Sequence, residues 1–232
     1  MDRRAFCFAI PTLSALPAFR RAPVRIACLG EQTTHSLHRV NDPEFPLLLG
    51  EALDRDFKAD PTSNPVAGGF FTGGGSHYRI GNFGSPNASV IDHALEKPQS
   101  LLRSPQLTAA EAFAPDIVIL GPFGEHEELT GLSMDHYAPD LKHLVERIRG
   151  FPSSPLVLLL LPIPAGGADD SPAYRQIREA TFDVARQTGQ PTVDLWTPFL
   201  GKAALFIDPT HLTESGRRKL AGIVAHAVHR RR

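Results

Sequence analysis

Short apolar runs alternate with segments of helical periodicity along most of this 232-residue chain. Five of the runs are typical of strands: Val24–Leu29, Tyr78–Phe83, Ile117–Leu120, Leu156–Leu161 and Thr192–Leu195. The fourth run contains no polar residue, as expected for a central parallel strand that is covered on both faces. This alternation predicts a three-layer α/β/α fold around a mostly parallel, five-stranded sheet.

Four segments place their apolar side chains on one helical face, as helices that cover such a sheet would do. They are centred on Phe45–Leu53, Leu141–Ile148, Ile177–Val184 and Leu220–Ala227. Ligands in these folds bind beyond the carboxyl ends of the strands. The loops expected to form a site therefore begin at Gly30, Gly84, Gly121, Pro162 and Trp196.

Two glycine-rich segments need a separate interpretation. Lys58–His77 links the end of a helix to the start of a strand, so we expect a surface insertion rather than a binding loop. Ala165–Ser171 follows a strand and faces the expected site. It is either a mobile lid or a long solvated turn, and the turn is the favoured interpretation.

The composition and the N-terminal residues limit which classes of protein are compatible with this chain. Lysine and arginine number 24 against 25 acidic residues, so nothing indicates nucleic-acid binding. Arg3-Arg4 followed by the apolar stretch Phe6–Phe19 resembles a Tat export signal, and the stretch is too short to span a membrane. We therefore expect residues 1–22 to be an export signal or leader, and 23–232 to be one domain, periplasmic or secreted. A cytoplasmic location is the alternative.

Asp208 and His211 stand three residues apart just before the last helical segment. A carboxylate at this spacing can fix the tautomer of the imidazole, which can then act as a general base. The alternative is a structural pair at the start of the helix. Cys28, in contrast, lies inside an apolar strand and is expected to be a small buried residue.

Four blocks of the sequence resemble those of the SGNH (GDSL-type) hydrolases, over about residues 24 to 228. Gly30-Glu31-Gln32-Thr33-Thr34 is similar to their Gly-Asp-Ser-x-Thr block, and Asn82–Ser89 to their second block. Pro115–Gly121 is similar to the strand before the third block, and Asp208–Leu212 to the last, Asp-x-x-His. The resemblance implies a flavodoxin-like sheet and a serine that attacks an acyl carbon, with His as the base.

This chain departs from the family at the residues that carry its chemistry. Gln32 occupies the serine position, and an amide is not an acyl acceptor. Asn87 aligns with the oxyanion glycine and Phe123 with the oxyanion asparagine, while His126 is added nearby. The predicted site is therefore Asp208 and His211 as catalytic residues, with substrate contacts from Gln32, Gly84, Asn87, Phe123 and His126.

Three functions are compatible with this pattern. The first is a hydrolase-like enzyme with a rebuilt site, in which Asp208–His211 activates water or a substrate hydroxyl on a carbohydrate-like or ester substrate. The second is an inactive ligand-binding or carbohydrate-binding protein. The third is an ordinary esterase with a displaced nucleophile, Ser36 or Ser85. The remaining histidines have no persuasive metal-ligand spacing, so we expect neither a metal nor a cofactor.

Overall fold

The computed structural model describes residues 22–35, 43–60, 71–86, 88–92, 99–124, 127 and 133–231. Its main sheet has the strand order β2-β3-β4-β1-β7-β8-β9. The five predicted strands form the parallel part of this sheet, namely β4 (Tyr78–Asn82), β1 (Val24–Leu29), β7 (Ile117–Leu120), β8 (Leu156–Leu160) and β9 (Thr192–Val193).

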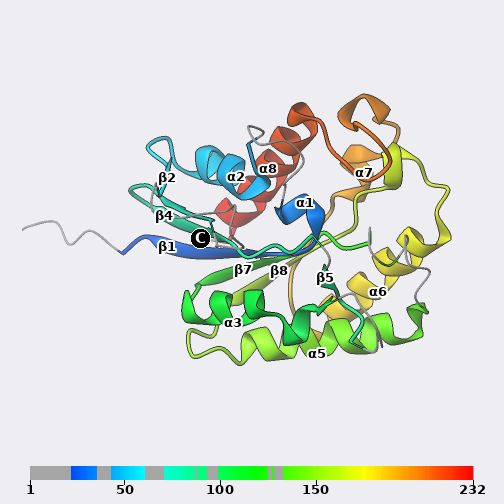
Figure 1. The fold of residues 1–232 in the computed structure, drawn as a ribbon, viewed down its shortest axis with the longest axis horizontal. Helices are drawn as coiled ribbons and strands as arrows, with labels where there is room; N and C mark the ends of the chain where they lie inside the picture. Colours follow the sequence, from blue (N-terminus) through cyan, green and yellow to red (C-terminus); the bar gives the residue numbers. More distant parts are fainter. Residues whose placement is uncertain are drawn as a thin grey trace, which may run out of the picture.

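Helices cover both faces of the sheet, which confirms the three-layer prediction (Figure 1). One face carries α2 (Phe45–Leu53) and α8 (Glu214–His229). The other carries α3 (Pro105–Ala112), α5 (Tyr137–Arg149) and α6 (Pro172–Thr188). Shorter elements are α1 (Gln32–His35), α7 (Trp196–Phe199) and a two-stranded sheet of β5 (Ala88–Ser89) and β6 (Gln99–Ser100).

Burial of β1 on both faces shows why apolar runs without polar alternation form this sheet. Ala27 and Leu29 pack in the core on the α5 side, whereas Ile26 and Cys28 pack in the core on the α2 side. Successive side chains of a strand point to opposite faces, so every position from 26 to 29 must be apolar. Cys28 is fully buried as expected, and burial raises the pKa of its thiol.

The expectation of a surface insertion over Lys58–His77 is wrong at both ends of the segment. β2 (Lys58–Ala59) and β3 (Phe71–Gly74) add two antiparallel strands at the edge beside β4, so the sheet has seven strands rather than five. A Cβ at Gly73 would lie 2.5 Å from the Phe57 ring. Glycine is needed there because the ring packs against the bare backbone of β3.

The described residues contain no helix that is long and apolar enough to cross a membrane. The proposed export segment, residues 1–22, falls outside the described part of the chain except for its last residue. Export therefore stays a prediction.

The carboxyl ends of β1 and β7 approach closely at Gly30. A Cβ on Gly30 would lie 2.4 Å from Thr34 Oγ1 and 2.8 Å from the Gly121 carbonyl oxygen. The Thr34 hydroxyl donates a hydrogen bond of 3.1 Å to that carbonyl and so holds α1 over the end of β7. β4 and β7 lie on opposite sides of β1, so the strand order switches at β1. The loops after β1 and β7 therefore meet at the switch point, which is where ligands bind in such sheets.

We expect Gly30→Ala to lower the free energy of unfolding by about 1–3 kcal/mol, because the added methyl overpacks this contact. Gly222→Ala is the matched control, since Gly222 is exposed in α8 and a Cβ there meets nothing within 4 Å. It should leave stability unchanged or raise it by up to about 1 kcal/mol. Urea unfolding of both variants measures the difference, and equal stabilities would contradict the close approach.

Candidate functional site

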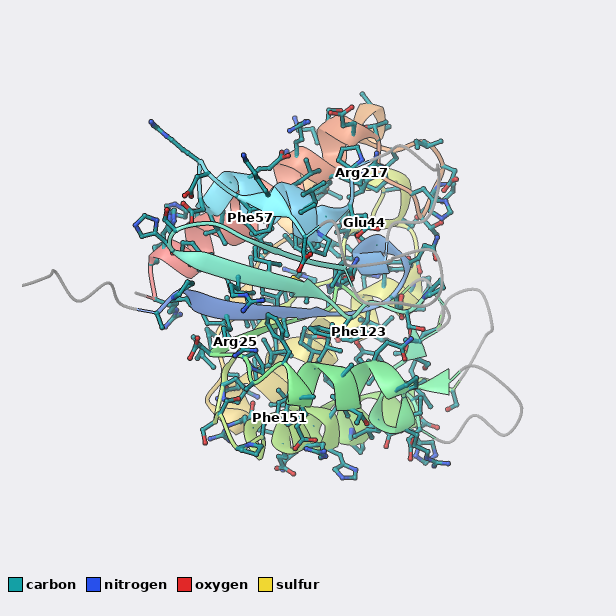
Figure 2. All side chains as sticks on the ribbon, turned by 60° about the vertical axis from the view of Figure 1, so that its left-hand side comes forward. Arg25, Glu44, Phe57, Phe123, Phe151 and Arg217 are labelled. Carbon is teal, nitrogen blue, oxygen red and sulfur yellow. The ribbon has the colours of Figure 1, made fainter. Side chains whose placement is uncertain are left out.

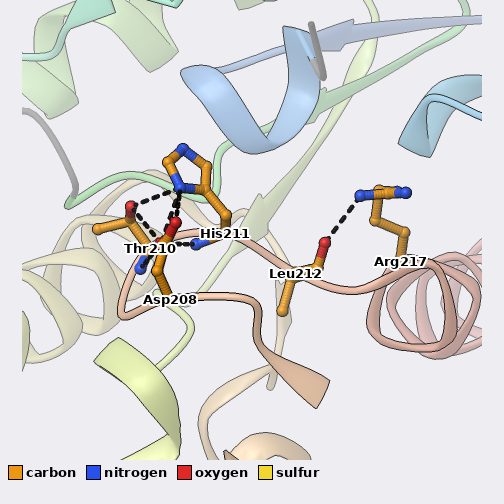
Figure 3. A network of polar contacts seen from close by, with 5 residues as sticks. All are labelled: Asp208, Thr210, His211, Leu212 and Arg217. Carbon is orange, nitrogen blue, oxygen red and sulfur yellow. Dashed lines mark hydrogen bonds and ion pairs between the residues drawn. The ribbon is translucent and has the colours of Figure 1, made fainter. Parts of the chain in front are cut away.

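Asp208 and His211 form a hydrogen-bonded pair at the tip of a short turn (Figure 3). Both carboxylate oxygens lie 2.7 Å from His211 Nδ1. The His211 side chain is 19% exposed and the Asp208 side chain 44% exposed. When Nδ1–H is donated to the carboxylate, Nε2 is the unprotonated nitrogen of the neutral ring, and this is the tautomer that a general base requires.

Asp208 also shapes the turn that carries the histidine. Its Oδ1 accepts the backbone N–H of Thr210 at 3.0 Å and of His211 at 2.9 Å, and it accepts the Thr210 hydroxyl at 3.3 Å. Burial raises the pKa of the carboxyl, but the hydrogen bonds from the His211 side chain and from these two amides outweigh it and lower the pKa. The carboxylate thus holds both the ring and the backbone that positions the ring.

The turn closes a short antiparallel pairing between Phe206 and Leu212. The Ile207 N–H donates to the His211 carbonyl at 2.7 Å, and the Thr213 N–H donates to the Leu205 carbonyl at 2.9 Å. His211 lies two residues before Thr213, whose hydroxyl caps α8. The base is therefore connected directly to the first turn of a long buried helix.

The segment after β8 supports the turn from the other side. The Gly166 N–H donates to the Pro209 carbonyl, and the Gly201 N–H donates to the Gly167 carbonyl, both at 2.7 Å. Gly167 has φ +80°, and a Cβ there would lie 3.1 Å from the Lys202 nitrogen. Ala165–Ser171 is thus a bonded turn, in line with the favoured interpretation, and it helps to position the Asp208–His211 loop.

Arg217 is a supporting residue that sequence reasoning missed. It is 5% exposed, and its Nη1 donates to the Leu212 carbonyl at 2.7 Å, one residue beyond His211 (Figure 3). The residue spacing could have indicated this burial. Arg217 lies three residues before Leu220 and seven before Val224, so all three share the buried face of α8. A charged residue on an apolar face needs a buried partner, and here the partner is the loop that carries the base.

Gln32 begins α1, directly after the end of β1, and its side chain is partly buried. The neighbouring residues Glu31 and Thr33 line a pocket together with Pro209, Thr210 and Leu212, so α1 and the His211 loop border one space. The pocket has a volume of about 20 Å³, enough for a water molecule. Figure 3 shows α1 above the His211 ring.

Glu31 has a structural contact. It is buried, and its carboxylate accepts the Gly124 N–H at 3.3 Å and 3.4 Å. This bond fixes the loop after β7, which contains Phe123. Phe123 is buried and lines the same pocket, so it supplies an apolar wall where the family has an amide donor (Figure 2).

The second predicted loop is only partly described. The Gly84 N–H donates to Asn82 Oδ1 at 2.9 Å, so this amide is already engaged. Ser85 is buried, and its N–H donates to the Gly30 carbonyl at 2.9 Å, close to the turn that carries Gln32. Asn87, His126 and Ser36 lie outside the described residues. Substrate contacts from Gln32, Gly84, Asn87, Phe123 and His126 stay predictions.

A further carboxyl group, Glu44, lies at the same end of the sheet and was not predicted. It precedes α2, and its Oε2 accepts Asn82 Nδ2 at 2.8 Å. Burial raises its pKa, and the Asn82 hydrogen bond partly offsets that effect. Figure 2 shows Glu44 and Arg217 on the same side of the sheet. Among the described residues, no group of three or more His, Cys, Asp or Glu side chains could hold a metal ion.

The pH dependence of stability should report the Asp208 contacts. A lowered folded-state pKa means that the ionised carboxylate stabilises the fold fully above its unfolded-state pKa, about 3.9, and that this contribution is lost as pH falls through the folded-state pKa. The difference in melting temperature between wild type and Asp208→Asn should therefore shrink as the pH falls below about 4.

The control repeats the comparison with His211→Ala in both proteins: the melting temperatures of His211→Ala and of the double variant Asp208→Asn with His211→Ala are measured over the same pH range. The His211 side chain is the largest of the interactions that lower the Asp208 pKa, so the pH-dependent part should become smaller without it. A stability difference that stays constant down to pH 3 would contradict the role of the ionised carboxylate.

Comparison with known proteins identifies the fold but not the family. No protein-family model matches the sequence, and no curated protein matches it significantly. Solved structures do match. An acetylxylan esterase from Geobacillus stearothermophilus is 17% identical, with a TM-score of 0.62 over 90% of this chain and 95% of that one. The lipase/acylhydrolase from Enterococcus faecalis is 17% identical, with a TM-score of 0.59 over 90% and 96%.

A second acetyl xylan esterase is 17% identical, with a TM-score of 0.58 over 88% of this chain and 100% of that chain. The matches extend over almost the full length of these structures. The mostly parallel sheet flanked by helices is thus the fold of SGNH-type hydrolases, as the four sequence blocks predicted.

Proposed function

We propose that this chain is a hydrolase of acyl esters on carbohydrates, in which Asp208–His211 activates water in place of a serine. The observation that carries the proposal is the contact of both Asp208 oxygens with His211 Nδ1, at 2.7 Å. The pair sits at the end of the sheet where ligands bind in this fold class. A charged partner that orients the ring and a supported turn are what a general base requires.

The proposed reaction needs no protein nucleophile. Water attacks the acyl carbon as its proton passes to His211 Nε2, and Asp208 stabilises the imidazolium that forms. The tetrahedral intermediate then collapses, and the imidazolium returns the proton to the leaving alkoxide. In this proposal the Gln32 amide, on the first residue of α1, holds the water or donates to the oxyanion. Phe123 closes the pocket without a side-chain donor.

The substrate class follows from two sources. Two of the similar structures are acetylxylan esterases, which act on acetylated carbohydrate by their names. The small pocket between α1 and the His211 loop suits a small acyl group or water rather than a long chain, because the space is about 20 Å³. The remainder of the substrate would then lie outside the pocket, over the loop ends. Export to the periplasm or beyond would bring the chain to such substrates.

A second candidate is an esterase with a displaced serine. The bond from the Ser85 N–H to the Gly30 carbonyl brings Ser85 close to the turn where the family has its nucleophile. Its burial counts against direct attack on a bulky ester. Both candidates use the Asp208–His211 base, so the burial of Ser85 is what favours the first one.

We expect His211→Ala to lower the rate of acetate release from an acetylated xylooligosaccharide by about 10²–10⁴-fold, because a positioned general base contributes that much. His143→Ala is the control, since His143 is an exposed histidine on α5 and should leave the rate unchanged. His143→Ala should melt as the wild type does, and His211→Ala should remain folded at the assay temperature. Unchanged turnover in His211→Ala would refute the assignment, and saturable binding without acetate release would support a ligand-binding protein.

A further inference from the structure

A second pocket lies far from the Asp208–His211 pair, between β9 and the last turns of α8. Its volume is about 240 Å³, on the order of eight water molecules. α8 starts three residues after His211 and has 16 residues, so its far end lies about 24 Å away along the helix. The pocket is therefore separate from the candidate active site.

Five of the ten residues that line this pocket are apolar. Leu158 and Val193 come from the two last strands of the sheet, and Ile223 and Ala227 come from α8, with Pro191 completing the wall. A small apolar group that entered the pocket would be shielded from water on its sheet side and on its helix side.

The rim of the pocket carries surplus positive charge. Arg230, Arg231 and His226 line it, and none of them makes a side-chain hydrogen bond or ion pair within the described part of the chain. Some other exposed arginines are paired, for example Arg103 with Asp92 and Arg186 with Asp183. The single carboxylate of the lining, Asp194, accepts the Thr197 N–H at 3.2 Å at the start of α7.

The edge of the sheet adds polar backbone groups. β9 is the last strand of the sheet, and its Pro191 and Val193 carbonyls accept N–H groups from Leu159 and Leu161. The intervening residue, Thr192, lines the pocket and turns its own N–H and carbonyl away from β8. Cations at the end of α8 also complement the helix dipole, but that effect does not explain an apolar pocket beneath them.

We propose that this pocket binds an organic anion with an apolar body, whose carboxylate or phosphate is held by Arg230 and Arg231 and whose body enters between β9 and α8. Arginine forms two parallel hydrogen bonds to such anions, which makes it suited to this recognition. The outward N–H of Thr192 supplies a further donor. The site does not depend on the proposed hydrolase activity, because its lining contains neither Asp208 nor His211 and shares no residue with the pocket beside the His211 loop.

Isothermal titration of the full chain with octanoate, acetate and inorganic phosphate tests this proposal. Octanoate should bind saturably at one site, and more tightly than acetate or phosphate, because only octanoate fills the apolar wall. The double variant Arg230→Ala with Arg231→Ala should weaken octanoate binding about tenfold or more. Arg149→Ala is the control, since it removes a cation from the last turn of α5, a helix that does not contribute to this pocket.

Two further variants keep the test decisive. Ala227→Phe fills the pocket while both arginines stay in place, and it should also abolish octanoate binding. His211→Ala should bind octanoate as the wild type does, which separates this site from the active site. Unchanged affinity in the double arginine variant would overturn the proposal. Equal affinity for octanoate, acetate and phosphate would overturn it too, because the apolar wall would then contribute nothing.

Discussion

The burial of β1 on both faces is the constraint on which the rest of the structure depends. Its residues 26 to 29 pack alternately into two separate cores, so the strand can only be central. A central β1 with β4 and β7 on either side brings the loops after all three strands to one end of the sheet. Gly30 is then forced against the end of β7, and Gln32 is placed at the edge of the candidate site.

The candidate base is held by contacts from three directions. Asp208 holds both the ring and the turn, Gly166 holds the Pro209 carbonyl, and Arg217 holds the Leu212 carbonyl. Most of these bonds involve backbone groups, so they fix the turn itself and not only one side-chain rotamer. A histidine supported in this way is already held in one orientation. This preorganisation is what base catalysis requires.

Much of this arrangement could be predicted from the sequence, for local reasons. Apolar runs and helical periodicity predicted the five parallel strands and the four main helices, because burial dictates both patterns. The Asp208–His211 contact was predictable because it depends on a spacing of three residues within one turn.

Other features could not be read from residue patterns. β3 is glycine-rich and has no alternation, and it exists because β4 pairs with it and the Phe57 ring packs against it. The support of Pro209 by Gly166 is a backbone bond between distant segments, which no side-chain pattern encodes. Arg217 could have been predicted only by noticing that a charged residue lies on the buried face of α8.

Intact-protein mass spectrometry during turnover of an acetyl ester tests the central claim most directly. If Asp208–His211 activates water, acetate should be released while the mass of the protein stays that of the free chain at every quench time. A protein population one acetyl group heavier, lost in Ser85→Ala, would contradict direct water activation and would establish an acyl-enzyme mechanism.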